Sequence, residues 1–119
     1  MTYVDGFVVP VPKAKIDEYR ALAEKMGAMW REHGALQYCE CKAEDVKPGK
    51  LTSFPQSVLL KDDETVVFAW IVYSSRAHRD EVMAKVMADP RTAAMTDMSK
   101  MPFDTKRMFF GGFEVMLDL

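Results

Sequence analysis

The sequence predicts an α+β fold of the ferredoxin-like type, in which a β-α-β-β-α-β order forms one antiparallel sheet with both helices on the same face. Two observations lead to it. Stretches with apolar residues at helical steps alternate with short extended runs of apolar and aromatic residues. One of these runs, residues 65–73, has eight apolar or aromatic residues out of nine. In a strand with one solvent-exposed face, apolar and polar residues would alternate. Both faces of this strand must therefore be covered.

Composition narrows the class of protein. The 119 residues, 49% hydrophobic and 29% charged, fit a single domain over residues 1–119. The net charge of −2 argues against a nucleic-acid partner, which would need a basic surface. No run approaches the ~20 apolar residues of a membrane span, and the N-terminus lacks the features of a signal peptide. We therefore expect a cytoplasmic protein without a membrane partner, with Cys39 and Cys41 reduced.

The first half of the chain predicts two strands around a long helix. The first strand covers residues 3–10, and the Pro-Val-Pro run at 10–12 is expected to end it. A helix over residues 13–33 follows, with an apolar stripe at steps of three and four. Gly34 is the expected residue just past its C-terminal cap. A second strand then covers residues 36–42.

Residues 45–64 are expected to form an inserted arm, because twenty residues are long for a plain loop. Pro55 could open a short helical turn in this arm. The alternative is an extra strand over residues 57–61.

The second half predicts a helix, a short extra helix and a last strand. Ser75 is a suitable N-cap for a helix over residues 76–88. The short extra helix is expected at about 92–100, and the last strand over residues 106–117. The adjacent glycines Gly111-Gly112 lie inside this strand, where they indicate a bulge or a close backbone approach.

The face of the sheet opposite the helices would expose a large apolar area on a monomer. A second copy packed sheet against sheet would cover it, which predicts a two-fold homodimer. The alternative is a monomer whose arm folds over its own sheet.

Alternation along the strands divides the side chains into two sets, and we expect the small or aliphatic ones beneath the helices. The set expected beneath the helices is Val4, Gly6, Val8, Cys39, Cys41, Val67, Ala69 and Ile71. The set expected on the open face is Tyr3, Asp5, Phe7, Tyr38, Glu40, Phe68, Trp70, Arg107 and Phe109. An apolar surface with a few polar groups is typical of a small-molecule site, so we expect the ligand on the open face.

Roles in such a site follow from side-chain chemistry. The wall would consist of Tyr38, Phe68 and Trp70. Glu40 or His33 would move protons, and Arg107 would hold an anionic group of the ligand. A purely structural alternative exists for each: Glu40 and Arg107 could pair across the dimer interface, and His33 could be a cation at a helix end.

Several common chemistries lack their motifs. No glycine-rich phosphate loop follows a strand, and no nucleophile elbow is present. Cys39 and Cys41 with His33 lack a fourth ligand and the usual zinc spacing. We therefore expect no metal and no bound cofactor.

Several short motifs, distinctive only in combination, are shared with a known family. They are Asp5-Gly6-Phe7-Val8-Val9-Pro10-Val11-Pro12, Glu32-His33-Gly34-Ala35-Leu36, Thr52-Ser53-Phe54-Pro55, Ser75-Arg76-Ala77-His78-Arg79-Asp80-Glu81-Val82, Val86-Met87-Ala88-Asp89-Pro90-Arg91, Met101-Pro102-Phe103-Asp104 and Gly111-Gly112-Phe113. Through them the chain resembles the YbaA-like family of bacterial proteins over essentially its whole length. The resemblance implies a dimeric α+β barrel, a fold shared with cofactor-free monooxygenases, haem-degrading enzymes and small-ring isomerases. It brings no catalytic residues of its own.

The shared motifs add Arg79 and Asp104 to the candidate residues. Asp104 lies in the connection before the last strand, where it could reach a barrel mouth and act in proton transfer. Its alternative is an Asx-turn, or a partner for Lys106 or Arg107. Arg79 becomes a further candidate for ligand binding.

Three functions remain open from the sequence. The first is a homodimer that binds a small aromatic or acidic metabolite and transforms it by cofactor-free acid-base or oxygenase-type chemistry. The second is a non-catalytic binding or sensing module with the same pocket. The third is a structural dimer without a ligand cavity.

Overall fold

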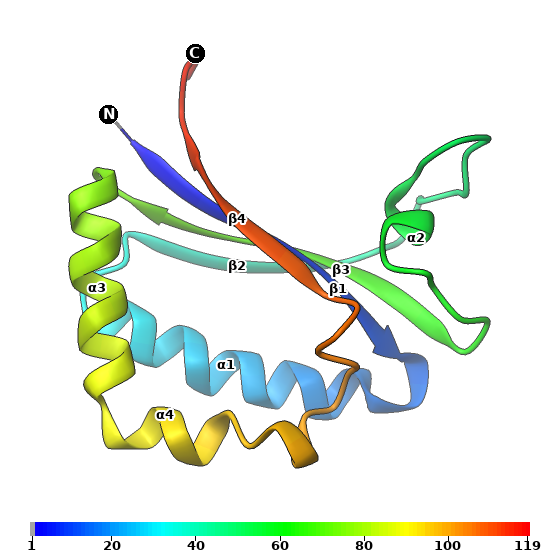
Figure 1. Ribbon diagram of the computed structural model, residues 1–119, viewed down its shortest axis with the longest axis horizontal. Helices are drawn as coiled ribbons and strands as arrows, with labels where there is room; N and C mark the ends of the chain where they lie inside the picture. Colours follow the sequence, from blue (N-terminus) through cyan, green and yellow to red (C-terminus); the bar gives the residue numbers. More distant parts are fainter. Residues whose placement is uncertain (1) are drawn as a thin grey trace.

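The protein folds as a four-stranded antiparallel sheet with its long helices packed on one face (Figure 1). The computed structural model describes residues 2–119, apart from the side chain of Met98. The elements are β1 (Tyr3–Pro12), η1 (Lys13–Lys15), α1 (Ile16–Glu32), β2 (Gln37–Lys42), α2 (Phe54–Ser57), β3 (Glu64–Tyr73), α3 (Arg76–Ala88), α4 (Pro90–Met95), η2 (Met98–Lys100) and β4 (Phe109–Glu114). The strand order β2-β3-β1-β4 is that of the ferredoxin-like fold, so the predicted fold class is confirmed.

The first strand is longer than the sequence predicted, because β1 continues through Pro10 and Pro12. On one side β1 pairs with β3 along its whole length, and on the other side β4 pairs with it only as far as Val8. Beyond Val8 that side of β1 is an edge, where a missing N–H costs no ladder hydrogen bond. The expectation that the prolines end the strand was therefore wrong.

The long helix begins with a 3-10 turn, η1, and continues as α1. Gly34 has a φ of +115°, a conformation that only glycine adopts without strain, so its expected role past the helix end is confirmed. Tyr19, Ala23, Met29 and Trp30 are buried along the helix, at steps that place them on the face toward the sheet.

The arm between β2 and β3 contains one helical turn, α2, and no extra strand over residues 57–61. Ser53 caps this turn by accepting a hydrogen bond from the backbone N–H of Gln56 at 3.1 Å. Pro55 lies in its first turn, as one of the two alternatives proposed. Val58 of the arm is buried against Val8 and Val66, which covers one end of the sheet.

The second half follows the expected order, and its short extra helix differs from the prediction. Ser75 caps α3 through the backbone N–H of His78, at 3.0 Å. The expected helix at 92–100 is instead α4 followed by the separate turn η2, and Asp89 caps the start of α4.

The last strand, β4, is shorter than predicted and has no bulge, because its register with β1 is continuous. A Cβ at Gly112 would lie 2.3 Å from the hydroxyl of Tyr3. Close approach, the second alternative at Gly111-Gly112, therefore explains this glycine.

The register corrects the two faces predicted for β1 and β2. Ala69 of β3 faces the helices as expected, and its cross-strand partners are Phe7 and Glu40. Directly opposed residues share a face, so Phe7 and Glu40 face the helices rather than the open side. The same register places Asp5 on the helix side and Val8 on the open side.

The open face of the sheet carries a row of aromatic rings. Phe54 contacts Phe68 with ring centroids 5.7 Å apart, and Phe68 contacts Trp70 at the same distance. Phe109 and Phe113 of β4 extend the row and are largely exposed. The arm covers only one end of this face, so it does not act as the lid of the monomeric alternative.

Candidate functional site

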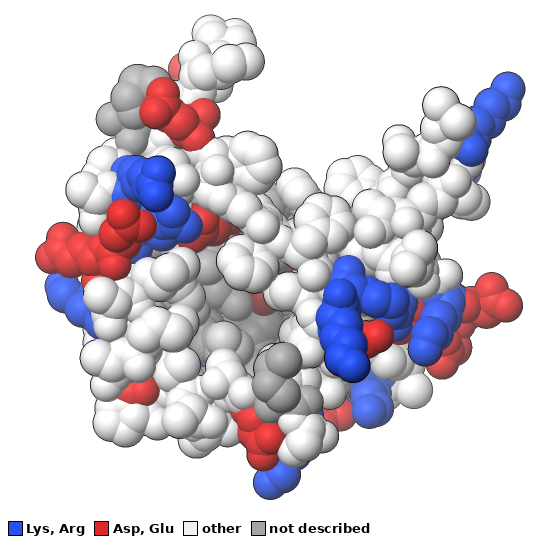
Figure 2. Space-filling view, viewed as in Figure 1, with Lys and Arg blue, Asp and Glu red and all other residues white. Residues whose placement is uncertain are grey.

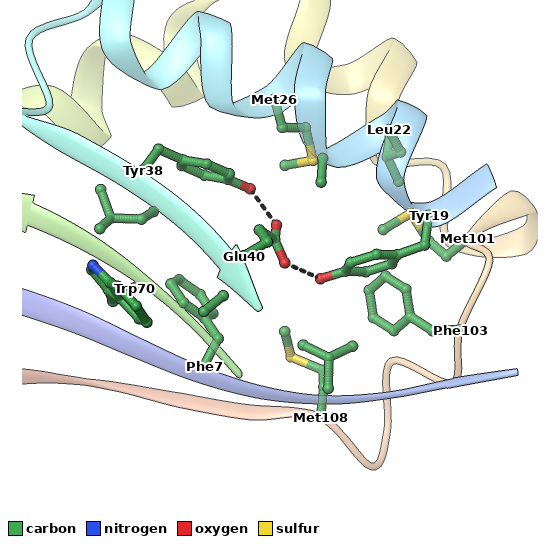
Figure 3. Close-up of a pocket in the computed structure, with 14 residues that line it drawn as sticks. Phe7, Tyr19, Leu22, Met26, Tyr38, Glu40, Trp70, Met101, Phe103 and Met108 are labelled. Atoms are coloured by element: carbon green, nitrogen blue, oxygen red, sulfur yellow. Dashed lines mark hydrogen bonds between the residues drawn. The ribbon is translucent and has the colours of Figure 1, made fainter. Parts of the chain in front are cut away.

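A cavity of about 150 Å³ lies between α1 and the sheet (Figure 3). Its wall is almost entirely apolar. The apolar lining side chains include Phe7, Val9, Leu22, Ala23, Met26, Met101, Phe103 and Met108. Figure 2 shows the molecule hollowed between the sheet and the helices. The cavity therefore lies on the helix side of the sheet, whereas the sequence analysis expected a ligand on the open face.

One carboxyl group, that of Glu40, lies in this apolar wall between two tyrosines (Figure 3). The Tyr19 hydroxyl donates a hydrogen bond to Glu40 Oε1 at 2.5 Å, and the Tyr38 hydroxyl donates to Oε2 at 2.9 Å. Each carboxylate oxygen therefore has one phenolic donor, which holds the group in a fixed orientation.

The environment shifts the pKa of all three groups. Burial raises the pKa of Glu40 above its ordinary value, although the hydrogen bonds from Tyr19 and Tyr38 oppose that shift. Burial, together with the neighbouring carboxylate, raises the pKa of both tyrosines. The tyrosines therefore remain hydrogen-bond donors, while Glu40 is the more acidic group and the one that can exchange a proton.

Local sequence explains how these three side chains meet. Tyr38 and Glu40 are two residues apart on β2 and so point to the same side. Tyr19 lies on the buried face of α1. A Cβ at Gly27 would lie 2.6 Å from Tyr38 Cδ1, so the glycine leaves room for the Tyr38 ring against α1.

The connection from η2 to β4 closes one side of the cavity through Met101, Phe103 and Met108. Phe103 meets the Tyr19 ring edge to face, with centroids 5.6 Å apart. This places the segment in contact with a side chain that orients Glu40.

Arg107 fixes the end of that connection. Its Nε donates to Asp104 Oδ2 at 2.9 Å, and Nη1 donates to Glu64 Oε1 at 2.7 Å. Nη1 also donates to the backbone carbonyls of Val58 and Leu59 in the arm. Arg107 thus joins the arm, the start of β3 and the segment before β4.

Glu40 is also reached from outside the cavity. Tyr19, Ala23 and Glu40 line a second, outer groove of about 380 Å³ beside the first turns of α1. The groove carries charged side chains, among them Arg20 and Lys42. The Tyr19–Glu40 pair therefore separates an apolar interior from a polar exterior.

The structure brings three of the eight predicted site residues to the cavity: Tyr38, Glu40 and Trp70. Trp70 borders it, and its indole N–H donates to Gln37 Oε1 at 3.2 Å. Phe68 lies in the aromatic row of the open face. The functional roles of these residues stay predictions.

The other four predicted residues are bonded to other side chains away from the cavity lining. Asp104 and Arg107 belong to the cluster that joins the arm to the last connection. His33 Nε2 lies 2.8 Å from Asp89 Oδ2 at the C-terminal end of α1. Arg79 of α3 pairs with the buried Asp5 at 2.9 Å. Arg107 is in the turn before β4, not on the strand where the sequence placed it.

Sequence reasoning did not assign Tyr19 or Phe103 to the site. Tyr19 falls within the apolar stripe of the helix expected over residues 13–33. The hydroxyl of a buried tyrosine usually has a hydrogen-bond partner. A tyrosine in the buried stripe of the helix could therefore have predicted a polar residue such as Glu40 on the facing strand.

Two further observations concern metal binding and membrane crossing. Within residues 2–119, no three His, Cys, Asp or Glu side chains are grouped so that they could hold a metal ion. In the same range, no helix combines the length and the apolar character needed to cross a membrane.

Comparison with known proteins places the chain in a family. The family model DUF1428, described as a protein of unknown function, matches residues 2–105. The chain is 48% identical over 118 residues to the uncharacterized protein YbaA of Escherichia coli (strain K12), with 99% of each chain covered.

Solved structures share the fold. A NIPSNAP family protein from Agrobacterium tumefaciens has a TM-score of 0.59 at 16% identity, covering 96% of this chain and 92% of that chain. A dimeric ferredoxin-like protein from an uncultured marine organism has a TM-score of 0.57 at 11% identity, with both chains fully covered at 100%. At these identities the likeness concerns the fold alone. By the match to its model over residues 2–105, the chain belongs to the DUF1428 family, and over nearly its whole length it is similar to YbaA.

Proposed function

We propose that this protein binds a small, neutral, mainly apolar molecule in the cavity between α1 and the sheet. The Glu40 carboxylate accepts a hydrogen bond from that molecule and is placed to take the proton. The observation that carries the proposal is a single carboxyl group, held by Tyr19 and Tyr38, in an otherwise apolar wall. A concave apolar site with one or two fixed polar groups is the usual form of a small-molecule site.

The size and charge of the cavity define the class of ligand. Apolar cavities of about 150 Å³ in other proteins hold a benzene-sized molecule. The carboxylate would repel an anionic ligand and would favour one that donates a hydrogen bond. A phenol, an enol or a small ring with an N–H group fits this description.

The same arrangement supports acid-base chemistry. Because its pKa is raised, Glu40 is a stronger base when ionised than an exposed carboxylate. It would take the proton from an O–H or an acidic C–H of the ligand, leaving the bonding electron pair on the ligand and forming an O–H bond on Glu40. A non-catalytic binding module would use the same cavity without this transfer, and a turnover assay on a bound ligand separates the two.

Three probes test the site by isothermal titration calorimetry: phenol, toluene and benzoate. We expect phenol to bind more tightly than toluene, and benzoate to bind most weakly. The Glu40→Gln variant should reduce the advantage of phenol over toluene, because hydrogen bonds to charged acceptors contribute more than neutral ones.

A variant that fills the cavity provides the decisive comparison. Ala23→Leu adds bulk to a buried position in the lining and should abolish binding of phenol and toluene. Ala28→Leu, at an exposed position of the same helix, is the matched control and should leave binding unchanged. Binding that is equal in both variants, or absent in the wild type, would reject the proposal.

We infer further that the protein is a cytoplasmic homodimer joined through the open face of the sheet. The exposed rings of Phe68, Phe109 and Phe113 form an apolar surface of the kind that a second copy of the chain would cover. The dimeric ferredoxin-like neighbour supports the same assembly. The free thiols of Cys39 and Cys41 support a reducing compartment.

Two phenylalanines of β4 allow a matched test of the dimer. Phe113 pairs with Val4 on the open face, whereas Phe110 stacks on Phe7 on the helix side, at 5.5 Å. Light scattering after size exclusion should show a dimer for the wild type and for Phe110→Glu, and a monomer for Phe113→Glu. An unchanged dimer in Phe113→Glu would exclude this face.

A further inference from the structure

One row of side chains crosses the whole sheet on its helix side. Its members lie directly opposite one another in the register, one on each strand. From β2 to β4 the row is Glu40, Ala69, Phe7 and Phe110. Because directly opposed residues share a face, all four side chains point toward the helices. The carboxyl group of the candidate site is therefore the first member of a row that continues to the other edge of the sheet.

The two ends of this row differ in chemistry and in exposure. At the β2 end, Glu40 is half-buried and accepts hydrogen bonds from Tyr19 and Tyr38. At the β4 end, Phe110 is 62% exposed although it faces the helix side. The row therefore begins at a fixed polar group and ends at an uncovered aromatic ring.

The cavity and this exposed ring are connected by apolar surface. Phe7 lines the cavity, and its ring stacks on that of Phe110 with the centroids 5.5 Å apart. Figure 1 views the molecule with β4 in front of the other strands, and Figure 2, in the same view, shows the hollow between the sheet and the helices open on this side. A molecule in the cavity could therefore extend toward the β4 edge without leaving apolar surroundings.

The length of the row sets the length of a molecule that would fill it. Neighbouring strands lie about 4.8 Å apart, so the three spacings from β2 to β4 amount to about 14 Å. A phenol bonded to Glu40 would place its ring against Ala69, whose small side chain leaves room in the lining. The single ring would end before the row does, and the surface of Phe7 and Phe110 would stay uncovered.

We propose that the ligand of this cavity is elongated, with a hydrogen-bond donor at one end, a ring in the middle and an apolar chain at the other end. The donor bonds Glu40, and the chain passes Phe7 and packs on Phe110 at the β4 edge. A phenol or an enol with an alkyl group opposite its hydroxyl belongs to this class. The inference rests on the proposed function and adds the shape of the ligand to it. Because Phe110 faces the helix side, a dimer joined through the open face would leave this position free.

A series of alkylphenols tests the shape by isothermal titration calorimetry on the full chain. The probes are phenol, 4-methylphenol, 4-ethylphenol and 4-propylphenol. Affinity should rise about fourfold with each added carbon, which corresponds to about 0.8 kcal/mol for a buried CH₂ group. The matched control is 2-propylphenol, which has the same composition but carries its chain beside the hydroxyl. It should bind no better than phenol.

Substitutions at Phe110 test where the chain of the ligand lies. Phe110→Ala should weaken the binding of 4-propylphenol roughly fivefold or more and leave the binding of phenol unchanged, because only the chain loses buried contact area. Phe110→Leu keeps an apolar side chain at this position and should retain part of the gain. Met87→Ala, at a position of α3 that is 61% exposed, is the matched control and should change neither affinity.

The outcomes separate this inference from the proposed function. If phenol binds but affinity does not rise along the series, or rises as much for 2-propylphenol, the elongated shape is wrong and the proposed function stands. A gain for 4-propylphenol that persists in full in Phe110→Ala would likewise overturn the inference. If neither phenol nor any alkylphenol binds, the proposed function fails and the inference fails with it.

Discussion

Arg79 Nη1 lies 2.9 Å from Asp5 Oδ1, and this contact joins α3 to β1, a central strand of the sheet. Asp5 is only 1% exposed, and its other oxygen accepts a hydrogen bond from the Tyr73 hydroxyl at 3.1 Å. The Arg79 guanidinium also lies 5.0 Å from the centre of the Tyr3 ring. Burial raises the pKa of Asp5, and the positive charge of Arg79 opposes that shift.

The first prediction concerns this pair. Arg79→Met removes the positive charge and leaves a buried carboxylate, which should lower the free energy of unfolding by about 3–5 kcal/mol. Urea denaturation at pH 7 measures this loss. Adding Asp5→Asn to Arg79→Met should recover most of it, because the unpaired charge is then gone. A loss that is equally large in the double variant would contradict the electrostatic explanation.

The second prediction concerns the pH dependence from Glu40. Its pKa is raised in the folded state, so ionisation disfavours folding, and stability falls as pH rises from the ordinary glutamate pKa of 4.5 through the folded value. Glu40→Gln cannot ionise and should therefore gain stability relative to the wild type across that window, with little difference below it. Urea denaturation at several pH values between 4 and 8 measures the gain, and Glu44→Gln at an exposed site is the control.

The third prediction concerns Arg107, whose hydrogen bonds and positive charge lower the pKa of Glu64 and Asp104. A lowered folded pKa gives stability that is present above the unfolded pKa and is lost as pH falls through the folded one. Arg107→Gln should therefore lower the free energy of unfolding at pH 7 and flatten its fall in acid. Arg107→Lys should not restore the wild type, because a lysine cannot bond Glu64 through two nitrogens. Acid titration followed by circular dichroism measures both effects.

The fourth prediction compares two adjacent glycines. A Cβ at Gly112 would overlap Tyr3, whereas one at Gly111 would only meet Phe113 at 3.7 Å, an ordinary contact. Gly112→Ala should lower the free energy of unfolding by about 1–3 kcal/mol, as overpacking does, and Gly111→Ala should cost less. Thermal unfolding of the two variants tests this. Equal losses would mean that general strand propensity, not Tyr3, decides the effect.

The sequence predicted the fold because the evidence for it is local. Residues 65–73 are apolar on both faces, the stripe of α1 repeats at helical steps, and Ser75 and Gly34 mark helix ends. Each of these signals depends on neighbours in the chain. Together they gave the element order, and the order gave the sheet topology.

The position of the site could not be predicted in the same way, because it depends on the register between strands. A shift of one residue moves Glu40 from one face to the other, and no local pattern fixes that shift. The assumption that small residues lie under the helices also failed. Beneath α1 the sheet carries the large side chains Phe7, Tyr38 and Glu40. These side chains line the cavity between α1 and the sheet, where small residues would have let the helix pack closely.

The Tyr19–Glu40 wall has a consequence for traffic through the protein. Because the Glu40 carboxyl group borders both the cavity and the outer groove, it can exchange a proton with the groove while a molecule occupies the cavity. Met101, Phe103 and Met108 line the cavity and not the outer groove, so a molecule bound in the cavity would contact these side chains instead. Binding of a ligand in the cavity and loss of a proton from Glu40 would then take place at different surfaces of the protein, and one would not have to wait for the other.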